Sequence, residues 1–183
     1  MSALLILLAI VVLAALALGL LYNNLVKLRN RIEGAWAQID VQLKRRYDLI
    51  PNLVETVKGY ASHEKETLDA VIRARNAAGA ASGPADQAQA ENMITSALRQ
   101  VFALSEAYPD LKANQGFLQL QEELAGTEGR ISYARQFYND TVLRYNTKIQ
   151  TFPTVVIANA MQFKEREYFE ADDASRGPVQ VQL

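Results

Sequence analysis

The sequence lacks several residue types on which common protein chemistries depend. It has no cysteine and a single histidine, His63, among 183 residues. Disulfides, thiolate nucleophiles, zinc fingers and iron–sulfur clusters are therefore excluded. A chain without thiols is stable on either side of a membrane, so the missing cysteine does not assign a compartment.

Helix-breaking residues are scarce, and neither sign of charge dominates. The chain has nine glycines and five prolines, and 50% of its residues are hydrophobic, which favours helices around a sizeable core. The net charge is −1 and the pI about 5.9. A strongly basic surface is the usual sign of nucleic-acid binding, so we expect no nucleic-acid partner.

The chain begins with a long uncharged segment, MSALLILLAIVVLAALALGLLYNN. About twenty apolar residues in a helix cover about 30 Å, the thickness of the bilayer core. Ala15–Ala17 resembles a signal-peptidase site, but no basic segment precedes it and the apolar run continues to Leu21. We therefore predict a transmembrane anchor over residues 1–22, with the lipid bilayer as partner.

Cations flank the anchor on one side only. Lys27, Arg29 and Arg31 follow it, whereas the preceding side offers only the α-amino group. The positive-inside rule then predicts a single-pass protein of the bacterial inner membrane, with its N-terminus outside and its body in the cytoplasm.

Apolar residues at intervals of three and four predict helices throughout residues 23–152. Short connections between them favour an all-α fold, an up-down-up-down antiparallel four-helix bundle of long helices. The fourth segment, from about residue 110 to 150, has a heptad-like, coiled-coil register. The predicted stripes are Leu25, Leu28, Ile32, Ala35, Ile39 and Leu43; Ile50, Leu53, Val57, Tyr60, Leu68 and Val71; Ala90, Ile94, Ala97, Val101, Leu104 and Tyr108; and Phe117, Leu120, Leu124, Thr127, Ile131, Ala134, Tyr138, Thr141 and Tyr145.

The stretch RRYDLIPNLVETVKGYASHE allows two interpretations. Asp48 as an N-cap and Pro51 in a first turn predict that one helix ends and another begins here. A continuous helix kinked at Pro51 is the alternative. We favour the turn, since it accounts for both residues. A second loop is predicted over residues 79–89, GAASGPADQAQ.

Two long stretches resemble the LemA family of bacterial membrane-anchored helical proteins: YNNLVKLRNRIEGAWAQIDVQLKRRYDLIPNLVETVKGYASHE and ANQGFLQLQEELAGTEGRISYARQFYNDTVLRYNTKIQTFP. The resemblance implies an anchor followed by a four-helix-type bundle without established catalytic activity. It also implies that some relatives remodel membranes, notably those of magnetosomes. Relatives encoded beside HtpX-type membrane metalloproteases imply a protease-linked role.

The residues offer no constellation for catalysis. A zinc-protease helix would need a second histidine where Thr67 stands, and a bundle di-iron centre needs two Glu-x-x-His motifs. Glu122, Glu123 and Glu128 fit a solvated helix face better than an acid–base pair. We therefore expect no enzyme activity, no cofactor, and no catalytic, cofactor-binding or metal-binding residue.

Polar residues near the stripes are candidates for hydrogen bonds between helices, with exposed helix surface as the equal alternative. They are Asn23, Gln38, Asp40, Gln42, Asn139 and Asn146.

Residues 153–170 form an apolar and aromatic segment too short to span a bilayer. We predict that this segment lies at the membrane surface or at a subunit contact, with packing on the bundle as the alternative. Residues 171–183 are predicted to be a flexible tail.

These features predict a membrane-anchored scaffold without catalytic activity that self-assembles into homo-oligomers, with membrane remodelling as an implied role. The alternative is an adaptor or regulatory partner of a membrane protein such as an HtpX-type metalloprotease.

Overall fold

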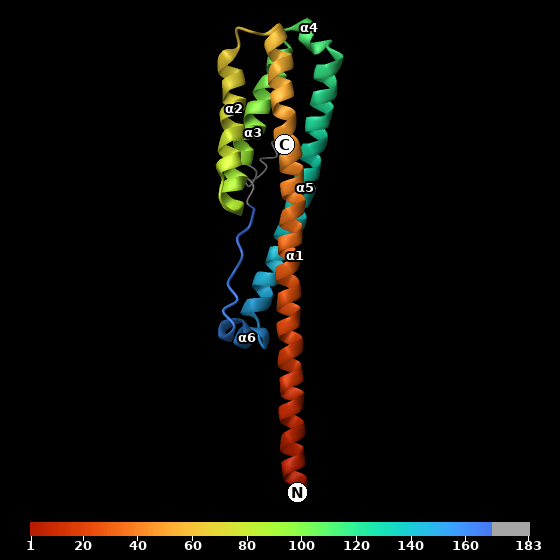
Figure 1. The fold of residues 1–183 in the computed structure, drawn as a ribbon, viewed down its shortest axis with the longest axis vertical. Helices are drawn as coiled ribbons and strands as arrows, with labels where there is room; N and C mark the ends of the chain where they lie inside the picture. The colour runs from red at the N-terminus through yellow and green to blue at the C-terminus, as the bar shows by residue number, and fades with distance from the viewer. Residues whose placement is uncertain (170–183) are drawn as a thin grey trace, which may run out of the picture. The chain divides into compact units, whose positions relative to one another are not determined.

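The computed structural model describes residues 1–169, and this part of the chain is helical (Figure 1). Its helices are α1 (Ser2–Tyr60), α2 (Lys65–Ala80), α3 (Pro84–Ser105), α4 (Pro109–Lys112), α5 (Gln115–Gln150) and α6 (Thr154–Ala160). Residues 1–169 contain no strand, so the predicted all-α class is confirmed. The tail predicted over residues 171–183 lies outside the described residues.

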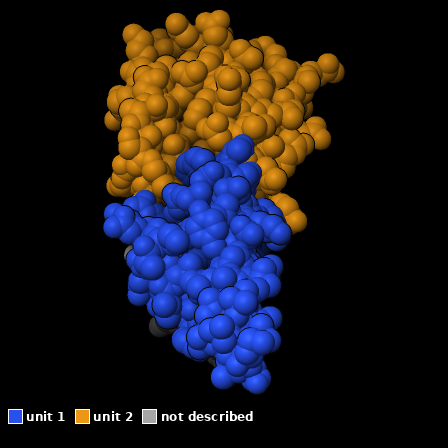
Figure 2. Space-filling view, turned by 60° about the horizontal axis from the view of Figure 1, so that its bottom comes forward, with its two compact units in different colours: residues 1–37, 136–167 blue, residues 38–135, 168–183 orange. Residues whose placement is uncertain are grey.

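The chain divides into two compact units, shown in different colours in Figure 2. Unit 1 comprises residues 1–37 and 136–167, and unit 2 comprises residues 38–135 and the chain from residue 168. The long helices α1 and α5 each contribute residues to both units.

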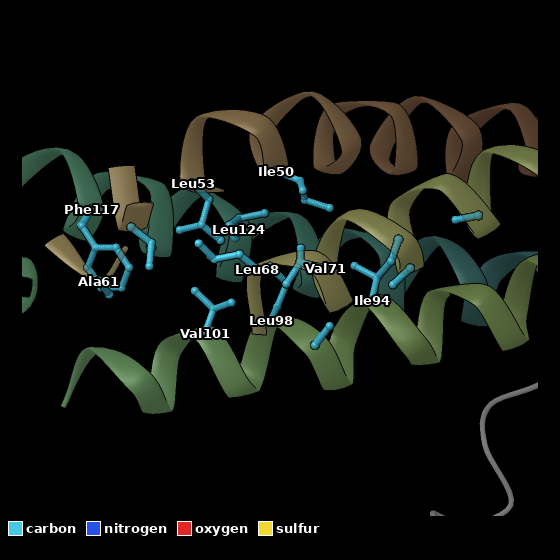
Figure 3. Close-up of a cluster of buried hydrophobic side chains, with 14 of the residues drawn as sticks. Ile50, Leu53, Ala61, Leu68, Val71, Ile94, Leu98, Val101, Phe117 and Leu124 are labelled. Carbon is cyan, nitrogen blue, oxygen red and sulfur yellow. The ribbon is translucent and has the colours of Figure 1, made fainter. Parts of the chain in front are cut away.

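The core of unit 2 is built from the stripes predicted for its helices, except that Tyr60 of the second stripe is exposed (Figure 3). Segments of α1, α2, α3 and α5 supply most of it, and Leu111 of α4 closes one end. Ile50, Leu53, Val71, Ile94 and Val101 are fully buried, at 0% exposure. Burying an aliphatic side chain of this size stabilises a fold by about 1.5–3 kcal/mol. Burial of these stripes therefore explains why the helices of unit 2 pack together.

The core of unit 1 joins α1, α5 and α6. Leu25, Ile32 and Ala35 of α1, Tyr138, Val142, Tyr145 and Ile149 of α5, and Ile157 and Ala158 of α6 are buried. Trp36 is half-buried, and its ring meets that of Tyr138 edge to face at 5.4 Å between centroids.

The predicted turn at Asp48 and Pro51 is wrong, because α1 continues through Pro51 to Tyr60. A proline inside a helix leaves the carbonyl four residues earlier without its backbone donor. Here that carbonyl belongs to Tyr47, and Nε of Arg75 donates to it at 3.0 Å. A side chain from α2 therefore replaces the missing hydrogen bond, and the helix persists.

The chain turns between Ala61 and Glu64 instead. Glu64 donates its N–H to the carbonyl of Ala61 at 3.1 Å, and its carboxylate accepts from Tyr108 Oη at 3.0 Å. His63, the only histidine, is exposed in this turn.

Two other predicted boundaries shift. The loop predicted over residues 79–89 is limited to residues 81–83, where Gly83 has a φ of 87° and Pro84 opens α3. The fourth predicted helix begins at Gln115 rather than near residue 110, because Asn114 caps it: its Oδ1 accepts from the N–H of Phe117 at 2.9 Å.

Candidate functional site at the end of the apolar helix

The N-terminal part of α1 exposes an uninterrupted apolar surface. The large side chains from Leu4 to Leu20 are 50–71% exposed, and the most apolar window has a mean hydropathy of 3.2. A continuous apolar surface of this extent marks an interaction site. By length and composition α1 can cross a membrane, a test that an N-terminal signal sequence also satisfies.

Where the apolar run ends, an aromatic ring from the other end of the chain packs on α1. The ring of Phe163 meets that of Tyr22 edge to face at 5.9 Å between centroids. The guanidinium carbon of Arg29 lies 5.9 Å from the centre of the same ring. Phe163 therefore lies beside two residues of α1 that are about two helical turns apart, directly after the apolar run.

The C-terminus of α6 directs Phe163 to this position. The N–H of Phe163 bonds to the carbonyl of Ala158 at 2.9 Å, and that of Gln162 bonds to Asn159 at 3.3 Å. Gln162 has a φ of 55°. This is the Schellman arrangement, which ends a helix and reverses the chain at a residue in the left-handed region.

Residues 163–167, here termed the C-terminal strap, form neither helix nor strand and are held by side chains of α5. Asn146 donates from Nδ2 to the carbonyl of Arg166 and accepts at Oδ1 from its N–H, both at 2.9 Å. Tyr145 donates to the carbonyl of Lys164 at 3.0 Å, and Tyr138 to that of Glu167 at 2.9 Å. Burial raises the pKa of both phenols, which keeps them protonated as donors.

The residues of α6 divide between the core and the surface. Ile157 is 7% exposed and Ala158 is buried, whereas Val156 and Met161 are 59% and 61% exposed and the preceding Phe152 is 84% exposed. Residues 153–169 thus partly follow the alternative of packing on the helices, and Phe169 is buried. The exposed apolar side chains keep the surface prediction open for α6.

A cleft of about 470 Å³ lies between the end of the apolar run of α1 and the strap. Its lining combines aromatic and apolar groups with three cations and one carboxylate: Tyr22, Arg29, Tyr145, Met161, Gln162, Phe163, Lys164, Glu165 and Arg166. Figure 1 shows α6 beside α1 above the free N-terminal turns.

Unit 2 contains a second polar group, the Arg46 cluster, which the sequence analysis missed. Nη1 of Arg46 lies 3.1 Å from Oε2 of Glu91, and Nη2 lies 3.0 Å from Oε2 of Glu128. Nη2 also donates to Thr95 at 2.8 Å. The side chains of Arg46 and Glu91 are 3% and 6% exposed, so this ion pair is buried. Arg46 lies three residues after Leu43 and four before Ile50, so its place on the apolar stripe was a detectable signal.

The carboxylate of Glu91 is well supplied with donors. Besides Arg46, Tyr47 donates its hydroxyl to Oε1, and Gln87 donates to the same oxygen at 3.1 Å. Burial raises the pKa of Glu91, and the hydrogen bond from Tyr47 and the charge of Arg46 oppose that rise. Burial and then the neighbouring carboxylate raise the pKa of Tyr47.

The carboxylates of Glu91 and Glu128 pair with the guanidinium of Arg46, which is typical of a structural ion-pair network, and Nε of Arg46 is buried without a hydrogen-bond partner among the described residues. A cavity of about 150 Å³ beside it is lined by Arg46, Thr95, Leu98, Arg99, Phe102, Leu124, Ala125 and Glu128. Within residues 1–169, no group of three or more His, Cys, Asp or Glu side chains could hold a metal ion.

The polar residues predicted between helices have different outcomes. Asn23, Gln38 and Asp40 lie on the exposed surface, and Gln42 is half-buried. Asn146 is buried and bonded, but to the strap rather than to a neighbouring helix.

The described residues define an all-helical protein whose N-terminal helix has the length and composition to cross a membrane. The chain belongs to the LemA family, whose sequence model matches residues 35–183, so the resemblance noted from its motifs is confirmed.

Named relatives are similar over most of the chain. Protein LemA of Metamycoplasma hominis is 29% identical over 161 residues, covering 86% of this chain and 72% of the relative. Magnetosome protein MamQ 2 of Paramagnetospirillum magneticum is 24% identical over 184 residues, covering 86% of this chain and 68% of the relative. Magnetosome protein MamQ of Magnetospirillum gryphiswaldense has the same identity and coverage.

Proposed function

We propose that this protein is a membrane-anchored helical scaffold without catalytic activity. The observation that supports it most is the exposed apolar surface of α1 from Leu4 to Leu20, which has no partner within unit 1 and the dimensions of a bilayer core. In this proposal the anchor remains uncleaved in a bacterial inner membrane, with the N-terminus outside and the body in the cytoplasm.

Membrane fractionation with mass measurement tests the anchor. The full chain is expected to stay in the membrane pellet after an alkaline wash, with an intact mass that includes the apolar segment. Cleavage after Ala17 would show that residues 1–17 are a signal sequence and would contradict the proposal.

Protease added to spheroplasts tests the orientation. The body is expected to survive until the cells are lysed, because cations follow the span on one side only. Digestion of the body in intact spheroplasts would reverse the proposed topology.

Self-association through the span is the second element of the proposal. Small residues allow helices to approach closely in lipid, and Ala15 and Gly19 lie one turn apart on α1. A Cβ added at Gly19 would meet nothing within 4 Å, so Gly19→Leu fits the single chain. This variant is expected to lower the mass of the detergent-extracted particle, whereas Leu18→Val is expected to leave it unchanged.

The same mass measurement separates a scaffold from an adaptor. A homogeneous homo-oligomer supports the scaffold. A small particle that acquires a second protein on co-purification would instead favour a role beside a membrane partner.

The helices of unit 2 are proposed to follow an up-down-up-down path, which is supported by the shared core of α1, α2, α3 and α5. Because the chain has no native cysteine, spin labels on engineered cysteine pairs can measure distances between helix ends without background. Short distances between the N-terminal end of α2 and the C-terminal end of α3 are expected, because antiparallel neighbours bring these two ends together although they are far apart in the sequence. Parallel neighbouring helices would contradict this path.

Membrane remodelling is proposed from the similarity to the magnetosome proteins. Reconstitution of the full chain into liposomes is expected to change their shape in electron micrographs. Liposomes with a span-only peptide at equal density provide the control, and equal effects would contradict a role for the helical body.

A further inference from the structure

We propose that the cleft between Tyr22, Arg29 and the C-terminal strap binds the phosphate of an anionic phospholipid headgroup. The inference rests on the proposed membrane anchoring, and it assigns a ligand to a site that a bare anchor would not need.

The position of the cleft along α1 matches the headgroup layer. Tyr22 directly follows the apolar run, and Arg29 lies seven residues later, about 10 Å along the helix axis. Helical side chains point back toward the N-terminus, which here is toward the bilayer. The guanidinium of Arg29 therefore reaches down to the level at which lipid phosphates lie.

The charge of the lining favours an anion. Within residues 1–169, neither Arg29 nor Lys164 forms an ion pair, although both line the cleft. Arg166 has only a 3.6 Å contact with Glu33, and the two side chains are 42% and 63% exposed. The single carboxylate of the lining, Glu165, accepts from Nε2 of Gln150 at 2.6 Å. Two cations thus remain available for a phosphate.

Two contacts restrict the side chain of Arg29 and the backbone of Lys164 before any ligand binds. The cation–π contact of Arg29 with Phe163, at 5.9 Å from the ring centre, favours a position of the guanidinium over this ring, and a guanidinium suits bidentate contacts with phosphate oxygens. The backbone of Lys164 is held by Tyr145 Oη at 3.0 Å. A preorganised pair loses less conformational freedom on binding than two mobile surface cations.

The apolar part of the lining indicates an amphiphile rather than a free ion. Tyr22, Met161 and Phe163 share the cleft with the cations, and Met161 is 61% exposed. A phospholipid would place its phosphate on the cations and its glycerol and acyl carbons against these side chains.

Native mass spectrometry of the detergent-extracted full chain tests the site. Phosphatidylglycerol and phosphatidylcholine are titrated in parallel, because both carry a phosphate but only the first is anionic. We expect phosphatidylglycerol to bind about 25- to 100-fold more tightly, since two cations contribute. The variant Arg29→Gln/Lys164→Gln is expected to lose most of this preference, since each cation near a membrane surface contributes about a five- to tenfold preference for anionic lipid.

The matched control removes two charges of the same unit outside the cleft. Lys27→Gln/Lys148→Gln has the same net charge as the test variant, and neither lysine lines the cleft. It is expected to retain the preference. An equal loss in both double variants would show general electrostatic attraction and overturn the proposed site.

Competition with inorganic phosphate tests whether the ligand is a lipid headgroup or a free phosphate ion. At millimolar concentration it is expected to displace little phosphatidylglycerol, because it lacks the apolar contacts. Full displacement by inorganic phosphate would overturn the lipid assignment.

Flotation of the wild type and the same variants with liposomes is measured in parallel with native mass spectrometry. A wild-type chain that floats but shows no preference for phosphatidylglycerol would refute the headgroup site alone. A wild-type chain that fails to float would refute the proposed anchor.

Discussion

Asn146 on α5 and Arg166 in the strap exchange a reciprocal pair of hydrogen bonds, each 2.9 Å long. The side-chain amide of Asn146 supplies one donor and one acceptor to the backbone of Arg166. A neighbouring strand in a sheet supplies the same two groups to a single residue. Because Arg166 lines the cleft, this pair connects the buried face of α5 to the cleft.

Replacing Asn146 with Ala is expected to lower the free energy of unfolding by about 1–3 kcal/mol, because the backbone groups of Arg166 lose their partners. Thermal unfolding of the detergent-solubilised chain, followed by circular dichroism, measures the effect. Asn30→Ala, at an exposed position of α1, supplies the baseline for helix propensity. Equal melting temperatures for the two variants would show that the pair contributes nothing.

The contact between Arg75 and Tyr47 predicts non-additive effects around Pro51. Pro51→Ala restores the N–H that the helix lacks and is expected to raise stability by about 1–3 kcal/mol. Arg75→Ala is expected to cost about 1–2 kcal/mol in the wild type and less in the Pro51→Ala background, since the restored backbone N–H then satisfies the Tyr47 carbonyl. Arg73→Ala, on the exposed face of α2, is the control. Strict additivity would contradict this account of the continuous helix.

The buried ion pair of Arg46 and Glu91 predicts that removing one partner alone destabilises the fold more than replacing both. Arg46→Met is expected to cost about 3–5 kcal/mol, because Glu91 keeps a buried charge without its cation. Adding Glu91→Gln should recover part of this loss by removing that charge. Denaturant unfolding measures both, and Arg45→Met, at an exposed neighbour, controls for the surface. A double variant less stable than Arg46→Met alone would argue against charge burial as the cause.

The raised pKa of Tyr47 predicts a loss of stability in alkali. Above about pH 10 the unfolded chain ionises at this phenol while the folded chain keeps its proton, so the folded state becomes less stable as pH rises. The contribution of Tyr47 is therefore complete below about pH 10 and is lost above it. Tyr47→Phe is expected to flatten the decline in melting temperature between about pH 10 and about pH 12. An unchanged slope would contradict the prediction, and the exposed Tyr133→Phe serves as control.

Local information in the sequence determined the helical class and the buried faces. Apolar spacing alone identified Leu25, Ile32, Ile39 and Leu43 on α1 and the stripe from Phe117 to Tyr145 on α5, all of it buried or half-buried. The period of a helix converts directly into one face, and burial of that face outweighs weaker local preferences. The uncharged first segment likewise showed in advance which part of the chain has the length and composition of a span.

The tertiary structure decided the outcome wherever a distant side chain overrides a local signal. Asp48 and Pro51 have the chemistry of a helix start, but Arg75, far along the chain, satisfies the carbonyl that proline leaves free, so the helix continues. The Arg46 cluster depends on two residues far along the chain, Glu91 and Glu128. The cleft exists only because the strap returns to α1 on hydrogen bonds from Tyr145 and Asn146. Periodicity reports which face of one helix is buried, whereas such pairings depend on which elements meet in space.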